Sequence, residues 1–216
     1  MNYTLIKQTA KLETPVGSLR GMLKRIEEAG RTCYKSEPKG QPEKFIAMII
    51  KRGHESVLEH GNVTIRFVCD RGISHEIVRH RIASPSQEST RYVNYANRGI
   101  GIVNPFSAFG HLKGGATKIA KLVEIWTRAM EQASQAYLDL IEAGAPPELA
   151  RSVLPNSTKT ELVLTANFRS WRNFLTLRTS KAAHPQMREV ANQVYDLFNK
   201  YVPVIVADLE KPEALK

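Results

Sequence analysis

The spacing of apolar positions along the chain follows two patterns, which together predict several helices and a few strands. Strands are predicted where apolar and polar residues alternate, at 2–12, 62–70 and 157–168. Helices are predicted where apolar residues recur three and four positions apart, at 18–31, 42–53, 72–83, 117–144, 147–155, 169–180 and 185–203. Helices segregated from a small number of strands favour an α+β fold. Because no polar linker divides the chain, we predict a single domain over residues 1–216.

Proline and glycine mark the predicted ends of these segments. Pro42 begins one helix and Gly53 ends it, and Gly144 caps the longest helix. Pro85 is expected to end the helix at 72–83, because the residue before a proline avoids helical backbone angles. The stretch 84–105 is predicted to be loop with some strand.

The composition narrows the class of protein without choosing its ligand. An apolar fraction of 42% is enough for a sizeable core, and a net charge of +10 favours anionic partners. Those partners are nucleic acids or phosphorylated small molecules. No apolar run reaches the roughly 18 residues of a membrane span, and no signal peptide is evident. Two cysteines suggest no disulfide framework, which fits a cytoplasmic location.

Histidine and cysteine spacing argues against a metal site and against a cysteine nucleophile. In the motif HESVLEH, His54 and His60 are six residues apart, so they would lie about 240° apart on a helix and would not share a metal ion. His54 alone is read either as a functional group or as a hydrogen-bonded residue at a helix start. Cys69 falls on the apolar face of a strand and is expected in the core, whereas Cys33 is compatible with a buried or a partly exposed place.

The segment RHRIASPSQESTRY, residues 79–92, concentrates cationic side chains and hydroxyls. Arginines and short hydroxyls in a loop are suited to binding a phosphate or a nucleotide. If the helix continued to residue 83, Arg79, His80 and Arg81 would fan out over about 200° of its end. The simpler reading is a solvated basic helix end that complements the helix dipole. A second polar set lies downstream and comprises Arg151, Asn167, Arg169, Arg172, Asn173 and Arg178.

Five motifs occur in the order in which they occur in the flavin-dependent thymidylate synthases. They are RTCYKS (31–36), HESVLEH (54–60), RHRIASPSQESTRY (79–92), ARSVLP (150–155) and NFRSWRNFLTLR (167–178). The chain resembles this family over roughly residues 30–195. The resemblance implies an α+β fold of mixed helices and a small antiparallel sheet. It also implies a methyltransferase that converts dUMP to dTMP, with 5,10-methylenetetrahydrofolate and NADPH as co-substrates and FAD as cofactor. The family forms homotetramers whose active sites lie between subunits, and it uses no cysteine nucleophile.

The resemblance assigns roles to individual residues of this chain. Arg178 is the implied catalytic residue, because its guanidinium would favour the ionised uracil ring. The implied flavin-binding residues are His54, Ser56, Arg79, His80, Arg81, Gln87, Asn167, Arg169 and Asn173. The implied dUMP-binding residues are Glu76, Arg79, Gln87, Glu88, Ser89, Thr90, Arg91, Arg151 and Arg178. Two positions depart from the family pattern: Glu76 stands where relatives often carry glutamine, and Gln87 where some carry glutamate.

Two other classes of protein remain as alternatives. A basic nucleic-acid-binding protein would show binding that weakens steeply with salt and would carry no chromophore. The sequence holds no helix-turn-helix, zinc or RNP-like motif, and its aromatic content of 7% offers few surfaces for base stacking. A flavoprotein reductase without methylation activity would need FAD but would not need Arg91 or Arg178.

Overall fold

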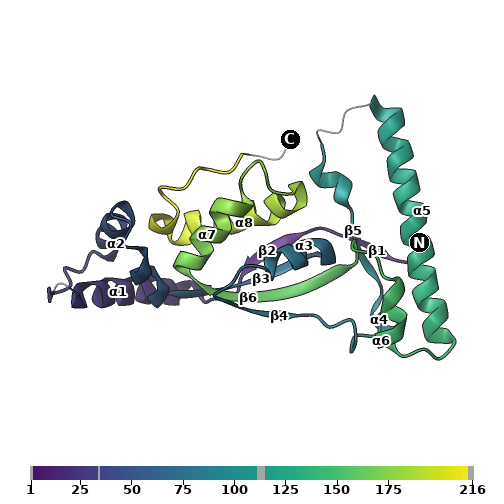
Figure 1. Cartoon of the computed structure of the whole chain (residues 1–216), viewed down its shortest axis with the longest axis horizontal. Helices are drawn as coiled ribbons and strands as arrows, with labels where there is room; N and C mark the ends of the chain where they lie inside the picture. Colours follow the sequence, from purple (N-terminus) through teal and green to yellow (C-terminus); the bar gives the residue numbers. More distant parts are fainter. Residues whose placement is uncertain (1, 34, 111–114, 214–216) are drawn as a thin grey trace.

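The computed structural model describes residues 2–33, 35–110 and 115–213 and has the predicted α+β architecture (Figure 1). The strands are β1 Thr4–Ile6, β2 Thr9–Leu12, β3 Asn62–Asp70, β4 Ala83–Gln87, β5 Gly101–Val103 and β6 Lys159–Asn167. The helices are α1 Val16–Thr32, α2 Pro42–Lys51, α3 Arg71–Ile77, α4 Tyr95–Arg98, α5 Gly115–Glu142, α6 Pro147–Ala150, α7 Phe168–Arg178 and α8 Pro185–Tyr201. The described residues also form short 3-10 helices, which are η1 Glu55–His60, η2 Pro105–Ala108, η3 Arg151–Val153 and η4 Pro203–Ile205.

The central sheet is antiparallel, with the strand order β2-β3-β6-β4. Strands β3 and β6 pair along their whole length, from Asn62 opposite Asn167 to Asp70 opposite Lys159. Alternate residues of both strands are buried beneath α3, α7 and α8, which lie on one face of the sheet (Figure 1). Trp171 of α7 is fully buried there, and its indole nitrogen donates a hydrogen bond to the carbonyl of Val63. Burying a large apolar side chain of this kind contributes about 1.5–3 kcal/mol.

The first predicted strand, 2–12, is in fact two strands that join different sheets. β1 pairs in parallel with β5, whereas β2 pairs with β3 of the central sheet. Between them Gln8 is buried, and its amide donates to the carboxylate of Glu189 on α8. The β1–β5 pair belongs to a second hydrophobic cluster that includes Tyr137 of the long helix α5. An alternating pattern does not reveal such a change of partner.

The helix predicted at 72–83 was too long, because α3 ends at Ile77. The chain then turns, and Ile82 has a φ of 60°, a left-handed conformation that is rare for a β-branched residue. Residues 83–87 form β4 against β6, with Pro85 opposite Leu164. Proline is tolerated in this position because β4 lies at the edge of the sheet. Pro85 is therefore a strand residue, and the prediction that it ends the helix was wrong.

The other helices match the predictions to within a few residues. Helix α5 ends next to Gly144, which has a φ of 91° and caps the helix as predicted. The segment predicted as one short helix at 147–155 is divided into α6 and the 3-10 helix η3. Within the described residues, no helix combines the length and the apolar character that a membrane crossing requires.

Candidate active site

Arg178 is held by two residues that lie about a hundred positions earlier in the chain. It is the last residue of α7, while Glu76 lies on α3 and His80 in the turn after α3. The Nε of Arg178 donates to Nε2 of His80 at 2.9 Å, and one terminal nitrogen donates to a carboxylate oxygen of Glu76 at 2.7 Å. The other terminal nitrogen donates to the Glu76 carbonyl at 3.3 Å. The guanidinium is therefore fixed in orientation, and its side chain remains 23% exposed.

His80 is a neutral acceptor in this arrangement. Burial, and secondly the nearby charge of Arg178, lower the pKa of His80 to about 4. The imidazole also packs edge-on against the ring of Phe174, with 4.9 Å between the ring centroids. Because the folded pKa lies below the ordinary value of 6.5, the unfolded chain binds the proton first as the pH falls. The free energy of unfolding therefore decreases between about pH 6.5 and pH 4 through this group.

Glu76 is already paired with Arg178. Its negative charge therefore offsets part of the positive charge of the guanidinium. The implied contact of Glu76 with a nucleotide sugar stays a prediction, and the structure adds a second role for it, the orientation of Arg178. The carboxylate of Glu76, which stands where relatives often carry glutamine, is thus the group that accepts a hydrogen bond from Arg178.

The predicted phosphate-binding residues gather in the turn that follows β4. Arg151 donates to the hydroxyl of Thr90 at 3.3 Å, and the amide of Arg91 donates to the Ser89 hydroxyl at the same distance. The guanidinium of Arg91 lies 4.0 Å from Glu148 and is more than half exposed. Two guanidinium groups and a serine hydroxyl are thus presented together. The Thr90 contact places Arg151 beside this turn within one chain.

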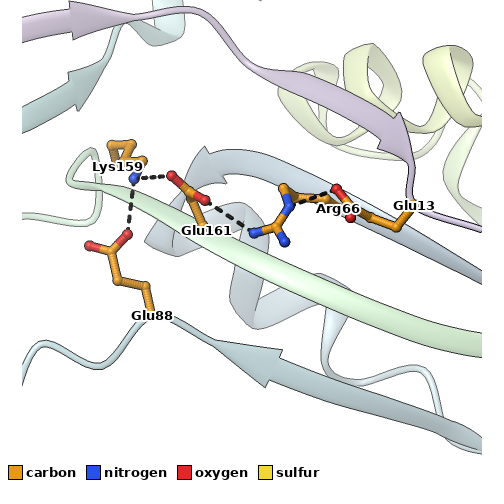
Figure 2. Close-up of polar contacts among 5 residues, drawn as sticks. All are labelled: Glu13, Arg66, Glu88, Lys159 and Glu161. Carbon is orange, nitrogen blue, oxygen red and sulfur yellow. Dashed lines mark hydrogen bonds and ion pairs between the residues drawn. The ribbon is translucent and has the colours of Figure 1, made fainter.

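Gln87 and Glu88 join this turn to the sheet. The amide nitrogen of Gln87 donates to the hydroxyls of Ser74 and Thr160, so this side chain is held in place. Glu88 accepts hydrogen bonds from the Tyr95 hydroxyl at 2.7 Å and from Lys159 at 2.9 Å. Figure 2 shows the contact with Lys159. An open groove of about 900 Å³ borders both residues.

The predicted flavin-binding residues divide between two places. Arg81, Arg169 and Asn173 line a cleft of about 530 Å³ at the N-terminal part of α7. Glu55 and Glu59 line the same cleft, and Glu59 pairs with Arg169 at 2.7 Å. His80, by contrast, contacts Arg178. The other candidates near these elements are His54 and Ser56, exposed at the start of η1, Asn167, which caps α7 through Ser170, and the exposed Arg79.

Cys69 does not lie in a setting that activates a thiol. Cys69 is buried in the core as predicted, and burial, with a smaller effect of Asp70, raises its pKa to about 12. A thiol with so high a pKa is not ionised near neutral pH. Cys33 is exposed.

Comparison with known protein families shows which family the chain belongs to. The family model described as thymidylate synthase complementing protein matches residues 16–204. The chain belongs to this family. The resemblance inferred from the five motifs is therefore confirmed.

Named relatives of the thymidylate synthase complementing protein family match most of the chain. The flavin-dependent thymidylate synthase of Geobacter sulfurreducens is 36% identical over 165 residues, which are 76% of this chain and 68% of that protein. The enzyme of the same name from Mycobacterium tuberculosis strain H37Rv is 34% identical over 206 residues, 86% of this chain and 78% of that protein. Among solved structures, the UMP/dUMP methylase PolB from Streptomyces cacaoi, bound with 5-Br UMP, matches with a TM-score of 0.77. It is 26% identical, and the match covers 95% of each chain.

The structure places two residues, Arg172 and Ile82, in surroundings that the sequence did not predict. Arg172 was grouped with the anion-binding arginines, but its side chain is 6% exposed and pairs with Glu55 and Asp208 inside the protein. Ile82 was not singled out, yet it lines the cleft of Arg81 and is 75% exposed. A positive φ at an isoleucine indicates local backbone strain, and this strain could not be predicted from the sequence pattern.

Proposed function

We propose that this member of the thymidylate synthase complementing protein family is a flavin-dependent thymidylate synthase, an enzyme that methylates dUMP to dTMP. The carbon comes from 5,10-methylenetetrahydrofolate. FAD, when bound and reduced by NADPH, supplies the hydride. The observation that carries the proposal is the hydrogen bond between Arg178 and neutral His80, which joins two family motifs 98 residues apart in the chain.

Arg178 is the proposed catalytic residue. Its fixed guanidinium would hydrogen-bond the uracil ring and stabilise negative charge as that charge develops at N3 and the adjacent oxygen. Electron density in the ring then rises at C5, the carbon that must attack the methylene group. Because neutral His80 and Glu76 hold the arginine in advance, little reorganisation is needed when the nucleotide binds.

The turn after β4 is the proposed phosphate site of dUMP. Ser89, Arg91 and Arg151 supply a hydroxyl and two guanidinium groups, and charge-assisted hydrogen bonds from arginine to phosphate are among the strong ones. Thr90 is 5% exposed and orients Arg151, so its proposed part in binding is indirect. The other proposed dUMP contacts are Glu76, Arg79 and Gln87.

The cleft beside α7 has the chemistry that FAD requires. Arg81 can pair with a diphosphate oxygen, and the amide of Asn173 can bind a polar ring edge. The acidic side chains in the cleft are neutralised by Arg169 and Arg172, so they do not oppose an anionic ligand. The remaining residues proposed to hold FAD are His54, Ser56, Arg79, His80, Gln87 and Asn167.

We further propose a cytoplasmic homotetramer in which the active sites lie between subunits. The cleft at α7 is bordered by Ile82, whose side chain is 75% exposed in the single chain. Helix α5 also exposes Leu122 and Ile125, and exposed apolar surface at more than one place supports contact with other subunits. The folate and NADPH would enter this shared site, and no nucleic acid partner is proposed.

Replacing Ser89 with alanine is expected to weaken dUMP binding while leaving the flavin content unchanged. Loss of a hydrogen bond to a charged phosphate corresponds to roughly a 10- to 100-fold increase in the dissociation constant. Isothermal titration of the holoenzyme with dUMP measures this change. The control is Ser107→Ala, which replaces an exposed serine of η2 whose hydroxyl donates to the backbone carbonyl of Asn104. Unchanged dUMP affinity with a complete loss of chemistry would instead make Ser89 a nucleophile.

A further inference from the structure

Both carboxylate oxygens of Glu88 are occupied inside the protein. One accepts a hydrogen bond from the Tyr95 hydroxyl at 2.7 Å. The other accepts from Lys159 at 2.9 Å (Figure 2). The Glu88 amide also donates to the carbonyl of Glu161 at 2.9 Å. The side chain is 17% exposed. A carboxylate held in this way is a poor ligand for a nucleotide, and its charge repels a phosphate group.

The two donors that hold Glu88 are themselves fixed by the fold. Lys159 begins β6, and a Cβ at Gly101 would lie only 2.9 Å from the Lys159 Cβ, so glycine is required there for the lysine stem to fit. Tyr95 is 4% exposed, and its amide donates to the hydroxyl of Tyr137. These contacts hold the Lys159 ammonium and the Tyr95 hydroxyl in position to donate hydrogen bonds to Glu88.

Both donors also keep their protons at neutral pH. Burial alone would lower the pKa of Lys159, but the hydrogen bonds that Lys159 donates to Glu161 and Glu88 outweigh it and raise the pKa above its ordinary value. Burial, followed by the hydrogen bond to Glu88, raises the pKa of Tyr95. The contacts to Glu88 are therefore stable across the physiological range.

Glu88 directly precedes the turn proposed to bind phosphate. The amides of Tyr92 and Val93 both donate to the carbonyl of Ser89, which closes the turn. We infer that Glu88, Lys159 and Tyr95 form an anchor that positions the Ser89–Arg91 turn for the phosphate of dUMP. In this account Glu88 and Lys159 are positioning residues rather than ligands. The inference rests on the proposed function, because it concerns the same phosphate site.

The anchor is one end of a row of charges that crosses the exposed face of the sheet. Glu161 joins Lys159 to Arg66, and Arg66 pairs with Glu13 beyond β2 (Figure 2). The Arg66–Glu13 end is more exposed, at 39% and 33%, and does not contact the turn. This end provides matched controls, because the same chemical changes can be made there without touching the anchor.

The test is Lys159→Met in the holoenzyme, with Glu88→Gln as a second variant. Both are expected to raise the KM for dUMP about tenfold, with kcat at saturating dUMP changed less than about twofold. Affinity for deoxyuridine, which lacks the phosphate, is expected to stay within about twofold. The controls are Lys11→Met, at an exposed lysine of β2 whose charge acts on Glu13, and Glu13→Gln. Both are expected to change neither quantity. The double variant is expected to be no worse than either single variant, because the two residues act through one contact.

Three results would overturn the anchor. One is a normal KM for dUMP in both variants. Another is an equal loss of affinity for dUMP and deoxyuridine, which would indicate general damage to the fold. The third is a Glu88→Gln defect that Lys159→Met does not share, which would make Glu88 a direct ligand.

Ser89→Ala and Arg91→Met separate this inference from the proposed function. If these two also leave dUMP binding unchanged, the phosphate site itself is misplaced. If they weaken it while Lys159→Met does not, only the anchor fails.

Discussion

Replacing Arg178 with alanine is expected to abolish dTMP formation while FAD stays bound. The variant removes the guanidinium proposed to stabilise negative charge on the uracil ring, and loss of one such donor lowers kcat by about 100- to 1,000-fold. It also leaves the Glu76 carboxylate without its partner beside the nucleotide. The residues proposed to hold FAD in the cleft at the start of α7 are unchanged. Product formation and the visible absorbance of flavin per mole of protein measure the two quantities separately.

Two further variants make this result specific to the position of the guanidinium. Arg178→Lys keeps the positive charge but loses the planar donor set that contacts both His80 and Glu76, so it is expected to restore little activity. Arg20→Ala removes an exposed arginine from α1 and is expected to behave as the unaltered enzyme. A second readout is His80, whose pKa should rise from about 4 when the neighbouring charge is removed. Normal turnover by Arg178→Ala would refute the assigned role.

Replacing Arg172 with methionine is expected to reduce stability strongly. This guanidinium contacts Asp208 at 2.6 Å, Glu55 at 2.9 Å and the carbonyl of Ile205 at 2.6 Å. Removing one member of a buried ion pair costs about 3–5 kcal/mol of unfolding free energy. The lower end applies here, because the side chains of Glu55 and Asp208 are 30% and 49% exposed. Chemical denaturation monitored by circular dichroism measures the difference.

The matched comparison for Arg172 is Arg169→Met, three residues earlier on the same helix. The Arg169–Glu59 pair is about half exposed, so its loss is expected to cost at most about 1 kcal/mol. Equal destabilisation by the two variants would contradict the account. The Arg172 contribution also depends on pH. Its hydrogen bond lowers the pKa of Asp208, so the stabilisation is present above the ordinary value near 4 and is lost as the pH falls further.

The strands β3 and β6 show what the sequence predicted well. In β3 the buried Val63, Ile65 and Phe67 lie at every second position, as do Leu162, Leu164 and Ala166 in β6, and this spacing fixes which face is buried. The end of α3 shows what it did not predict. Ile77 and Val78 continue a helical pattern, but the chain leaves the helix because residues 83–87 pair with β6, far away in the sequence. Long-range pairing of this kind leaves little trace in a local window.

The sequence predicted which residues belong to the candidate site, but it did not predict which of them contact one another. The motif RHR suggested that three neighbours act together, yet His80 contacts Arg178 while Arg81 lines the cleft at α7. Arg169 and Arg172 have similar sequence surroundings. Only the fold shows that Asp208 and Glu55 pair with Arg172, because these carboxylates lie 36 and 117 residues away from it in the chain.

The most direct test of the proposed function is the visible absorption spectrum of the purified protein, recorded after incubation with FAD and again after addition of dUMP. The account predicts a flavin spectrum that shifts when dUMP binds, because nucleotide and flavin would share one site around His80 and Arg178. A flavin spectrum that does not respond to dUMP would contradict it and favour a reductase. A protein that binds no flavin at all would contradict it more deeply, and nucleic-acid binding would then be the leading explanation of the basic surface.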